Sequence, residues 1–440
     1  MPAFDRLTER LGQYLQATGV PAFALGVVQG SELVYAQGFG SVGSRGSQRL
    51  VSEDTLFPSC STAKPITATL IMRLVERGLL NLDEPIVRHL SWLTYPEGGD
   101  VSQVTLRHLL THTSGLSSDP DIPECFFSGS RDCLEHYVRH DVPRYKAAGS
   151  PGEVFWYSNA GFNIAGLLAE HVTSTRFADL AEEMIFSPVA MTSTSFDAAA
   201  PKLAGKTLDT VDDLRRPPVL YPAGGAVTTI QDLAKLAISH MHGGRLPVGR
   251  LLDEQTVRSM HERQADAYTR QPRWYGLGFD IEYHRGRKLV THGGGGFGCG
   301  STFVMVPQEK LAFIALFNHP AGYGVNARNI LDELLGLSDS PEQGVKHAYP
   351  AMWSSYGGTY RSAWPDTEGY PNEVTITVST DSLQMVLGRR AHSLVSAEGP
   401  VYVTEDGGSS IGFVPGGRYL MFDAFGIGLV SAWPYIKVRA

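Results

Sequence analysis

The hydrophobic pattern of the chain has two periods, one typical of helices and one typical of strands, and they alternate along its length. Near the amino terminus, apolar residues recur at helical spacing and predict an amphipathic helix that docks on a core, through Phe4, Leu7, Leu11 and Leu15. Two apolar runs, FALGVVQ (23–29) and ELVYAQGFG (32–40), then flank a turn at Gly30–Ser31. This arrangement predicts a β-hairpin.

Helical patterns dominate the middle of the chain. The segment FPSCSTAKPITATLIMRLVERGLL (57–80) predicts a largely apolar helix, and VTLRHLLTHTSGL (104–116) predicts a second helix. Residues 117–150 are rich in Pro, Ser, Gly and Asp, which favours irregular surface structure. Residues 157–185 predict a turn and two helices, and residues 221–244 predict a Gly-Gly turn and one helix.

Strand-like runs follow. WYGLGFDIEY (274–283), KLVTHGGGGFGCGSTFVMVP (288–307) and LAFIALFN (311–318) predict three consecutive strands. The segment ARNILDELLG (327–336) predicts a closing helix.

The pattern changes again after residue 337. SDSPEQGVKHAYP (338–350) predicts a linker, and from Tyr356 short strand-like runs alternate with Gly, Pro and Asp turns. These runs predict an antiparallel β-barrel. A chain of 440 residues is too long for one compact core. We therefore predict two domains, residues 1–340 and residues 350–440.

Charge and composition exclude several classes of partner. A net charge of -8 and a pI near 6.0 argue against nucleic acid or an anionic membrane as the main partner. No stretch approaches the roughly 20 apolar residues of a membrane span. Residues 1–16 lack a basic region and a long apolar run, so they do not resemble a secretory signal and predict a cytoplasmic protein.

The four cysteines do not form a disulfide framework in a chain of this length. Cys125 and Cys133 could pair in an exported protein. In a reducing cytosol, which the amino-terminal sequence favours, we expect them to stay free thiols.

Ser61 and Lys64 are the first candidates for chemistry. Three positions apart at the start of a predicted helix, they share one face. A helix N-terminus favours a serine alkoxide, and burial pushes a lysine toward the neutral amine that accepts the serine proton. Pro65 is compatible with a first helical turn. A Ser-x-x-Lys pair also arises by chance, with a solvated lysine, so the interpretation depends on companion residues.

Tyr157 and Asn159 are such companions, on a predicted turn before a helix. A tyrosine oxygen near the Ser–Lys pair could relay a proton to a leaving group, and the asparagine amide could hold a substrate carbonyl. Tyr370-Pro371-Asn372 fits the same pattern, but no helix is predicted after it, so we interpret it as a chance match.

His292 and the glycines that follow it form a third element. Glycine inside a strand often marks the close approach of a ligand, and here Gly293 and Gly294 would lie beside the substrate. The N–H groups of Gly295 and Ser61 could form an oxyanion hole. The alternative is a flexible loop with an exposed histidine, which the apolar strand sequence on both sides disfavours.

Two competing motifs lack their required context. His108 and His112 have helical metal-ligand spacing, but HLLTH lacks the glutamate of the zinc-protease motif, so no metal is expected. GSSIG (408–412) matches a nucleophile elbow, but the sequence FVPG directly after it cannot form the helix that this motif requires. No cofactor is expected.

Together, Ser-x-x-Lys, Tyr-x-Asn and His-Gly-Gly in this order resemble the serine β-lactamase-like family, which includes penicillin-binding proteins, class C β-lactamases, esterases and D-aminopeptidases. The resemblance covers about residues 3–335 and extends to LLTHTSGL (109–116), PGEVFWYSN (151–159), YPAGGAVTTIQDLAKL (221–236) and YGLGF (275–279). It implies an α+β fold in which an antiparallel sheet, built from the first and last strands, is flanked by helices, with a helical subdomain between them.

The resemblance also implies roles for the candidate residues. Ser61 would be acylated, Lys64 and Tyr157 would move protons, Asn159 would bind substrate, and His292 would line the third edge of the site. His292-Gly293-Gly294 stands where penicillin-binding proteins and most β-lactamases carry Lys-Thr-Gly, whose lysine helps to bind a substrate carboxylate. This difference argues against β-lactams and cell-wall peptides as substrates. The His-Gly-Gly form is similar to that of esterases, D-aminopeptidases and thioesterases.

The barrel at the carboxyl end is similar to the lipocalin-like domain of D-aminopeptidases and to the layout of stand-alone penicillin-binding-protein-type thioesterases, which cyclise nonribosomal peptides. Our first hypothesis is therefore transfer of a peptidyl thioester, free or on a carrier-protein domain, onto Ser61 and release as a macrocycle. The second is an esterase or D-aminopeptidase that hydrolyses the same acyl-enzyme. The third is an acyl-binding sensor without turnover. Arg439 could bind a carboxylate or carrier phosphate, although a solvated arginine is the simpler interpretation.

Overall fold

The computed structural model describes most of the chain. The described residues are 2–18, 20–42, 49–96, 99–117, 133–197, 200–203, 222–269, 273–296, 298–319, 327–337, 353–363, 371–379, 382–396, 400–405, 409–424 and 433–439. The linker predicted over 338–350 lies outside them, so the domain boundaries stay predictions.

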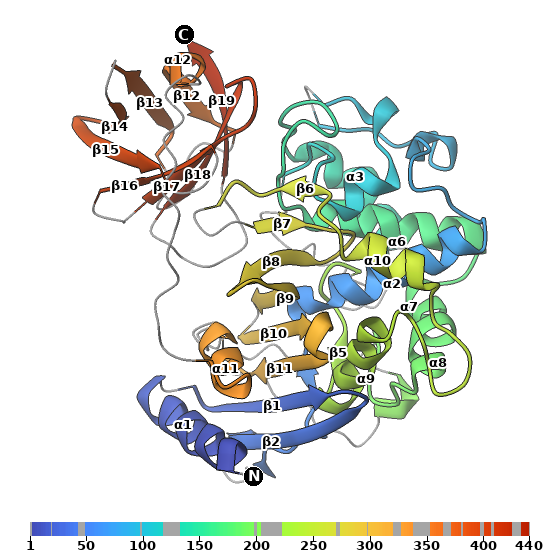
Figure 1. Cartoon of the computed structure of the whole chain (residues 1–440). Coiled ribbons are helices and arrows are strands. Elements are labelled where there is room, and N and C mark those ends of the chain that lie inside the picture. The colour runs from blue at the N-terminus through green and yellow to red at the C-terminus, as the bar shows by residue number, and fades with distance from the viewer. Residues whose placement is uncertain are drawn as a thin grey trace.

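A nine-stranded antiparallel sheet forms the centre of the larger part of the molecule, in the order β3-β2-β1-β11-β10-β9-β8-β7-β6 (Figure 1). Its strands are β1 (Ala22–Gln29), β2 (Glu32–Val42), β3 (Arg49–Leu50), β6 (Ala265–Asp266), β7 (Arg273–Tyr275), β8 (Asp280–His284), β9 (Arg287–Gly296), β10 (Cys299–Val306) and β11 (Leu311–Phe317). The first and last strands meet in the middle, where β1 pairs with β11 from Phe23↔Phe317 to Gln29↔Leu311. The sheet predicted from the resemblance is confirmed.

Strand β11 shows how the sheet separates two cores. Its residues alternate between faces, so Ile314 and Leu316 belong to one apolar cluster, and Phe313 and Phe317 to another. Both faces are covered, which explains why the strand reads as a continuous apolar run.

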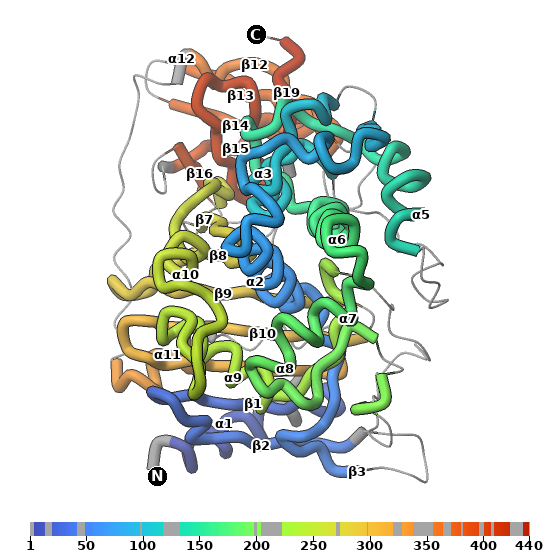
Figure 2. Tube along the Cα trace, turned by 90° about the vertical axis from the view of Figure 1, so that its right-hand side faces the viewer, coloured from blue at the N-terminus to red at the C-terminus, as the bar shows by residue number. Residues whose placement is uncertain are grey.

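Helices cover both faces of the sheet (Figure 2). On one face, α1 (Pro2–Thr18) and α11 (Ala327–Leu334) pack through residues that include Leu7, Leu11 and Leu331. The larger cluster on the other face includes residues of α2 (Ala63–Glu76), α3 (Leu106–Leu110), α5 (Cys133–His140), α6 (Asn159–Thr173), α7 (Phe177–Ala181), a π-helix (Glu182–Phe186), α8 (Ser187–Val189), α9 (Ile230–Met241) and α10 (Glu254–Met260). A two-stranded sheet pairs β4 (Phe57–Pro58), which precedes α2 in the chain, with β5 (Val227–Thr228), which precedes α9.

The carboxyl-terminal part is a closed antiparallel barrel, as predicted (Figure 1). It consists of β12 (Gly358–Ser362), β13 (Glu373–Val378), β14 (Leu383–Leu387), β15 (Arg390–Ser396), β16 (Val401–Thr404), β17 (Ser409–Phe413), β18 (Tyr419–Ala424) and β19 (Trp433–Arg439), and the short α12 (Trp353–Tyr356) precedes it. Aromatic side chains such as Tyr360, Tyr402 and Phe413 share one buried cluster. The barrel therefore has a packed core of its own.

The barrel touches the rest of the molecule beside the segment that leads to Tyr157. Glu153 accepts a hydrogen bond from the Tyr419 hydroxyl at 2.8 Å and pairs with Arg418 at 3.2 Å. Next to this contact, Val154 packs with Val414 and Met421.

Three expectations about elements were wrong. The helix predicted over 104–116 is only one short turn, α3, because His112 adopts a left-handed φ of 58° that ends any helix. The run 288–307 is two strands, β9 and β10, which pair antiparallel from Gly296↔Cys299, and the run 274–283 is likewise two strands, β7 and β8. Residues 133–140 of the region expected to be irregular form α5, and most of the remainder, 118–132, lies outside the described residues.

None of the described helices combines the length and hydropathy that a bilayer-spanning helix needs.

Candidate active site

Ser61 lies in a tight turn just before α2. Residues Cys60–Thr62 form a single 3-10 turn, and α2 begins at Ala63, so the serine precedes the helix by two positions. The turn is held from both sides, because Ser59 N–H donates to Ala226 O at 2.7 Å and Ser301 Oγ donates to Ser59 O at 2.6 Å. Ser61 itself remains partly exposed. A fixed and accessible hydroxyl is what a nucleophile requires.

Lys64 is fully buried and directed at Ser61. Its side chain is 0% exposed, and Nζ donates to Ser61 Oγ at 3.1 Å, Asn159 Oδ1 at 2.7 Å and Ala223 O at 2.8 Å. An ammonium has three N–H donors, and these three oxygens match them. In the neutral amine, the Asn159 and Ala223 oxygens can still accept two N–H groups while the lone pair faces Ser61. The arrangement therefore suits both protonation states of a general base.

Tyr157 and Asn159 lie beside Lys64, at the start of α6. Asn159 is the first residue of α6, whose N-cap Ser158 accepts from Gly161 N–H through its side chain. The Lys64 ammonium lies 4.6 Å from the centre of the Tyr157 ring. The structure thus brings together Ser61, Lys64, Tyr157 and Asn159, as the sequence predicted.

His292 lies at the third edge of this group but is buried. It is 1% exposed, and its ring centre is 6.4 Å from that of Tyr157. Nδ1 donates to Gly293 O at 2.6 Å, so Nε2 accepts from the Tyr275 hydroxyl at 2.8 Å. Burial, and then the charge of Lys64, hold the pKa of His292 well below its usual value. A neutral histidine with both nitrogens engaged fixes Tyr275 and the edge of β9. Its predicted part in the catalytic site stays a prediction.

The glycines of β9 lie against the nucleophile turn. A Cβ atom at Gly294 would come 2.7 Å from Ser61 N and 2.3 Å from Ser301 Oγ, so only glycine fits there. Gly295 is exposed and Gly293 is partly exposed. Pairing between β8 and β9 ends at Asp280↔Thr291, so among the described strands residues 292–296 pair only with β10. That edge of β9 can accept an extended substrate. The oxyanion hole of Ser61 and Gly295 stays a prediction consistent with this placement.

Two thiols hold the end of this hairpin. Cys299 Sγ and Cys60 Sγ both donate to Gly296 O, at 2.8 and 3.7 Å. A hydrogen bond to Cys60, and then burial, raise the pKa of the Cys299 thiol well above its usual value. Cys299 is therefore a neutral donor, and the two side chains connect the residue before Ser61 to β9.

Cys133 carries a disulfide bond, so the expectation of a free thiol there was wrong. Cys125 lies outside the described residues. Because disulfides persist mainly in oxidising compartments, this bond gives no support to the predicted cytoplasmic location.

The other candidate residues from the sequence do not belong to the group around Ser61 and Lys64. His108 caps α3 through Thr105, and Arg439 is exposed on β19. Ser410 lies on β17, which pairs with the next strand, β18, rather than leading into a helix. Tyr370 lies outside the described residues. Within the described ranges, no group of three or more His, Cys, Asp or Glu side chains is arranged to hold a metal ion.

Sequence reasoning missed three contributors. Tyr275, Ala223 and His112 lie in segments that carried the family resemblance, yet no pattern within those segments said which atoms reach the site. Burial raises the pKa of Tyr275 well above its usual value, so this residue is a neutral donor to His292. The backbone carbonyl of Ala223 has no signal in sequence.

Fold and site together define a serine acyl-transfer protein with a Ser-x-x-Lys nucleophile. A profile of the family described as Beta-lactamase matches residues 4–336, and the chain belongs to this family, whose members include serine hydrolases. The chain is similar to penicillin-binding protein 4 of Amycolatopsis lactamdurans, with 26% identity over 72% of this chain and 87% of the relative. It is also similar to the unguisins hydrolase ungD' of Aspergillus campestris, with 25% identity over 72% of this chain and 62% of the relative.

Among solved structures, SurE superposes with a TM-score of 0.73 over 99% of both chains at 21% identity. This likeness extends the shared fold to the whole chain, barrel included.

Proposed function

We propose that this protein takes a peptidyl thioester onto Ser61 and releases the peptide as a macrocycle. The observation that carries the proposal is the fully buried Lys64 ammonium 3.1 Å from Ser61 Oγ, with Asn159 and Tyr157 beside it. A buried amine in hydrogen-bond contact with a hydroxyl is the arrangement of a general base and its nucleophile.

The reaction has two balanced steps. Ser61 Oγ attacks the thioester carbonyl as its proton passes to Lys64, the C–S bond breaks, and the thiol leaves with a proton. The amine at the other end of the peptide then attacks the ester, the bond from Ser61 Oγ to the acyl carbon breaks, and the serine regains its proton. In this proposal Tyr157, whose ring centre lies 4.6 Å from the Lys64 ammonium, passes the proton to the leaving group. Asn159 and the edge of β9 beyond Thr291 hold the peptide backbone.

The layout supports cyclisation over hydrolysis. The barrel contacts Glu153 and Val154, directly before Tyr157, and could help to exclude water from the acyl-enzyme. The full-length likeness to SurE supports the same two-part arrangement. The alternative is an esterase or amidase that uses water in the second step, and the relative named as an unguisins hydrolase supports it.

Product analysis separates these activities. The full chain is incubated with a peptidyl N-acetylcysteamine thioester bearing an L or D residue at the acyl position, and products are identified by mass spectrometry. Cyclic product and a transient adduct on the Ser61 peptide are expected for the wild type. Neither is expected for Ser61→Ala, and both are expected for the matched control Ser31→Ala in an exposed turn.

Only linear acid, with rapid turnover of p-nitrophenyl esters, would support the hydrolase. A stable adduct without turnover would support an acyl-binding sensor. No adduct on Ser61 from any donor would overturn the proposal.

A further inference from the structure

His112 holds three consecutive residues of the active-site segment at once. Its carbonyl accepts from Trp156 N–H at 2.7 Å, and its Nδ1 accepts from Ser158 N–H at 3.0 Å. Its ring lies 4.2 Å from the ring of Tyr157, centre to centre. One histidine therefore contacts the backbone on either side of Tyr157 and the Tyr157 side chain itself.

The backbone conformation of His112 directs its ring toward these contacts. Its φ of 58° lies in the left-handed region, which only a few per cent of non-glycine residues occupy, histidine more often than most. Residues held in this region persist only where the surroundings fix them, and they concentrate at functional sites. This conformation ends α3 and turns the ring of His112 back into the core, where it is 0% exposed.

The protonation state and the neighbours of the His112 ring also favour a structural role. Because Nδ1 accepts a hydrogen bond, the proton of the neutral ring lies on Nε2, and this buried atom has no hydrogen-bond partner among the described residues. Its neighbours are aromatic, with Tyr275 at 4.5 Å and Phe162 at 5.2 Å between ring centres. Burial, and then the charges of Lys64, His292 and Arg273, hold the pKa of His112 well below its usual value. The ring is thus an uncharged support.

We propose that His112 is a positioning residue for Tyr157: it fixes the Tyr157 ring beside Lys64 by packing against it and by anchoring residues 156 and 158. The inference rests on the proposed function of Ser61. It explains why this histidine, at metal-ligand spacing from His108, lies among aromatic rings instead of beside further ligands.

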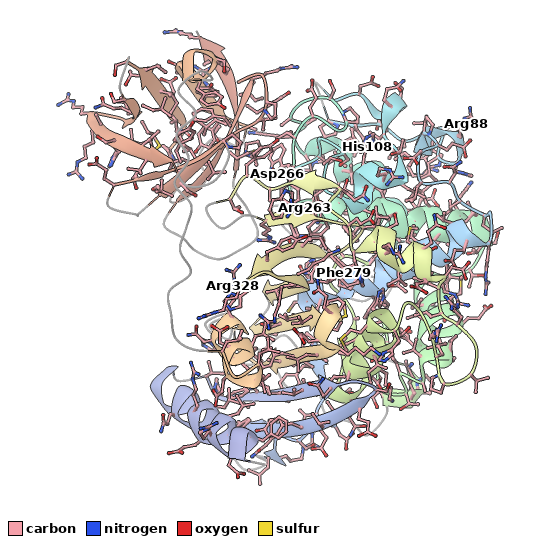
Figure 3. The ribbon with its side chains drawn as sticks, viewed as in Figure 1. Arg88, His108, Arg263, Asp266, Phe279 and Arg328 are labelled. Atoms are coloured by element: carbon pink, nitrogen blue, oxygen red, sulfur yellow. The ribbon has the colours of Figure 1, made fainter. Side chains whose placement is uncertain are left out.

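Three substitutions separate the two contacts of the ring. His112→Ala removes both. His112→Asn keeps a short acceptor that can reach Ser158 N–H, and asparagine tolerates a left-handed φ, but the ring is lost. His112→Phe keeps a ring against Tyr157 and loses the acceptor. His108→Asn is the matched control, because His108 lies four residues earlier on α3 (Figure 3) and caps that helix through Thr105.

The readout is the single-turnover acylation of Ser61 by a p-nitrophenyl ester, per folded molecule, with the folded fraction taken from circular dichroism. We expect His112→Ala to lower the maximal acylation rate about tenfold or more with KM within about threefold, because small misplacement of a reacting group costs rate. His112→Asn and His112→Phe should each recover part of that loss, and His108→Asn should acylate as the wild type does.

Acylation within twofold of the wild type in all three His112 variants would overturn the proposal, as would an equal loss in His108→Asn. If the Ala or Phe variant does not fold, His112→Asn decides alone: wild-type acylation would contradict the role of the ring. Absence of acylation in the wild type would instead overturn the proposed function.

Discussion

Lys64 Nζ donates to Asn159 Oδ1 across 2.7 Å, and this contact joins the start of α2 to the start of α6. The same ammonium is 3.1 Å from Ser61 Oγ. The amide that we expect to hold substrate therefore also orients the base. Substrate that competes for Asn159 would alter the environment of Lys64 at the moment of reaction.

An acidic residue at position 159 should shift the pH dependence of acylation. In Asn159→Asp, a carboxylate next to the Lys64 ammonium stabilises the charged form, so the pH of half-maximal acylation should rise by about 1–3 units. Stopped-flow acylation between pH 6 and pH 10 measures this shift, with Asn159→Ala as the neutral control. An unchanged or lower midpoint in the Asp variant would contradict a base role for Lys64.

Removing the Lys64 amine should lower the acylation rate more than changing its pKa does. Lys64→Ala should lower the acylation rate at least ~100-fold, the low end for loss of a general base. Lys64→Arg should be similarly slow, because a guanidinium keeps its charge and cannot accept the serine proton. Single-turnover rates check both variants. Near-normal kinetics in either variant would rule out proton transfer through Lys64.

Gly294 should not tolerate a methyl group. A Cβ there would come 2.7 Å from Ser61 N and 2.3 Å from Ser301 Oγ, so Gly294→Ala must displace the nucleophile turn. We expect acylation to fall at least tenfold and the free energy of unfolding to fall by about 1–3 kcal/mol. Urea unfolding and single-turnover kinetics measure the two effects. Gly12→Ala, where nothing lies within 4 Å, is the control. It should leave acylation unchanged and, inside helix α1, should raise the free energy of unfolding by up to about 1 kcal/mol instead of lowering it.

Buried histidines should make the fold sensitive to acid. His240 forms hydrogen bonds with Thr69 of α2 and with His261. Burial lowers the pKa of His240 to about 4. The unfolded chain takes up this proton near pH 6.5 and the folded chain does not. The free energy of unfolding should therefore fall as the pH drops from about 6.5 to about 4, by about 3 kcal/mol for His240 alone.

Urea unfolding at pH 7.5 and pH 4.5 measures this loss. His240→Gln, which stays neutral, should show a flatter pH dependence, and an unchanged slope in that variant would assign the effect to other groups.

The barrel contact should be energetically coupled. Tyr419 Oη donates to Glu153 Oε2 at 2.8 Å, and the Glu153 side chain is exposed. We expect a coupling of about 0.5–1.5 kcal/mol, reduced from the usual strength of a charged hydrogen bond by solvent. A double-mutant cycle with Glu153→Gln and Tyr419→Phe measures it by urea unfolding, and strictly additive effects would show that the contact contributes nothing.

Parts of the site were predictable because their signals are local. Ser61 and Lys64 are three residues apart, so the 3-10 turn and the start of α2 that follows it bring them together. Runs of apolar residues bounded by turn residues predicted β1, β2 and β11, and the short runs after Tyr356 predicted the barrel. His112 shows the limit of such signals. Its spacing from His108 looks like a metal motif on a helix. However, α3 ends at Leu110, between the two histidines, and His112 has a left-handed φ that cannot continue the helix.

The sequence by itself determined which elements form and which residues carry reactive groups, because propensity, periodicity and side-chain chemistry are written into short stretches of chain. Only the tertiary structure decided which groups meet: the Ala223 carbonyl on Lys64, the Tyr275 hydroxyl on His292, and the Gly296 carbonyl between two thiols. These contacts join residues far apart in the chain and depend on the packing of helices against the sheet. Protonation follows the same rule, since the lowered pKa of His292 comes first from burial, a property of the folded core and not of its neighbours in sequence.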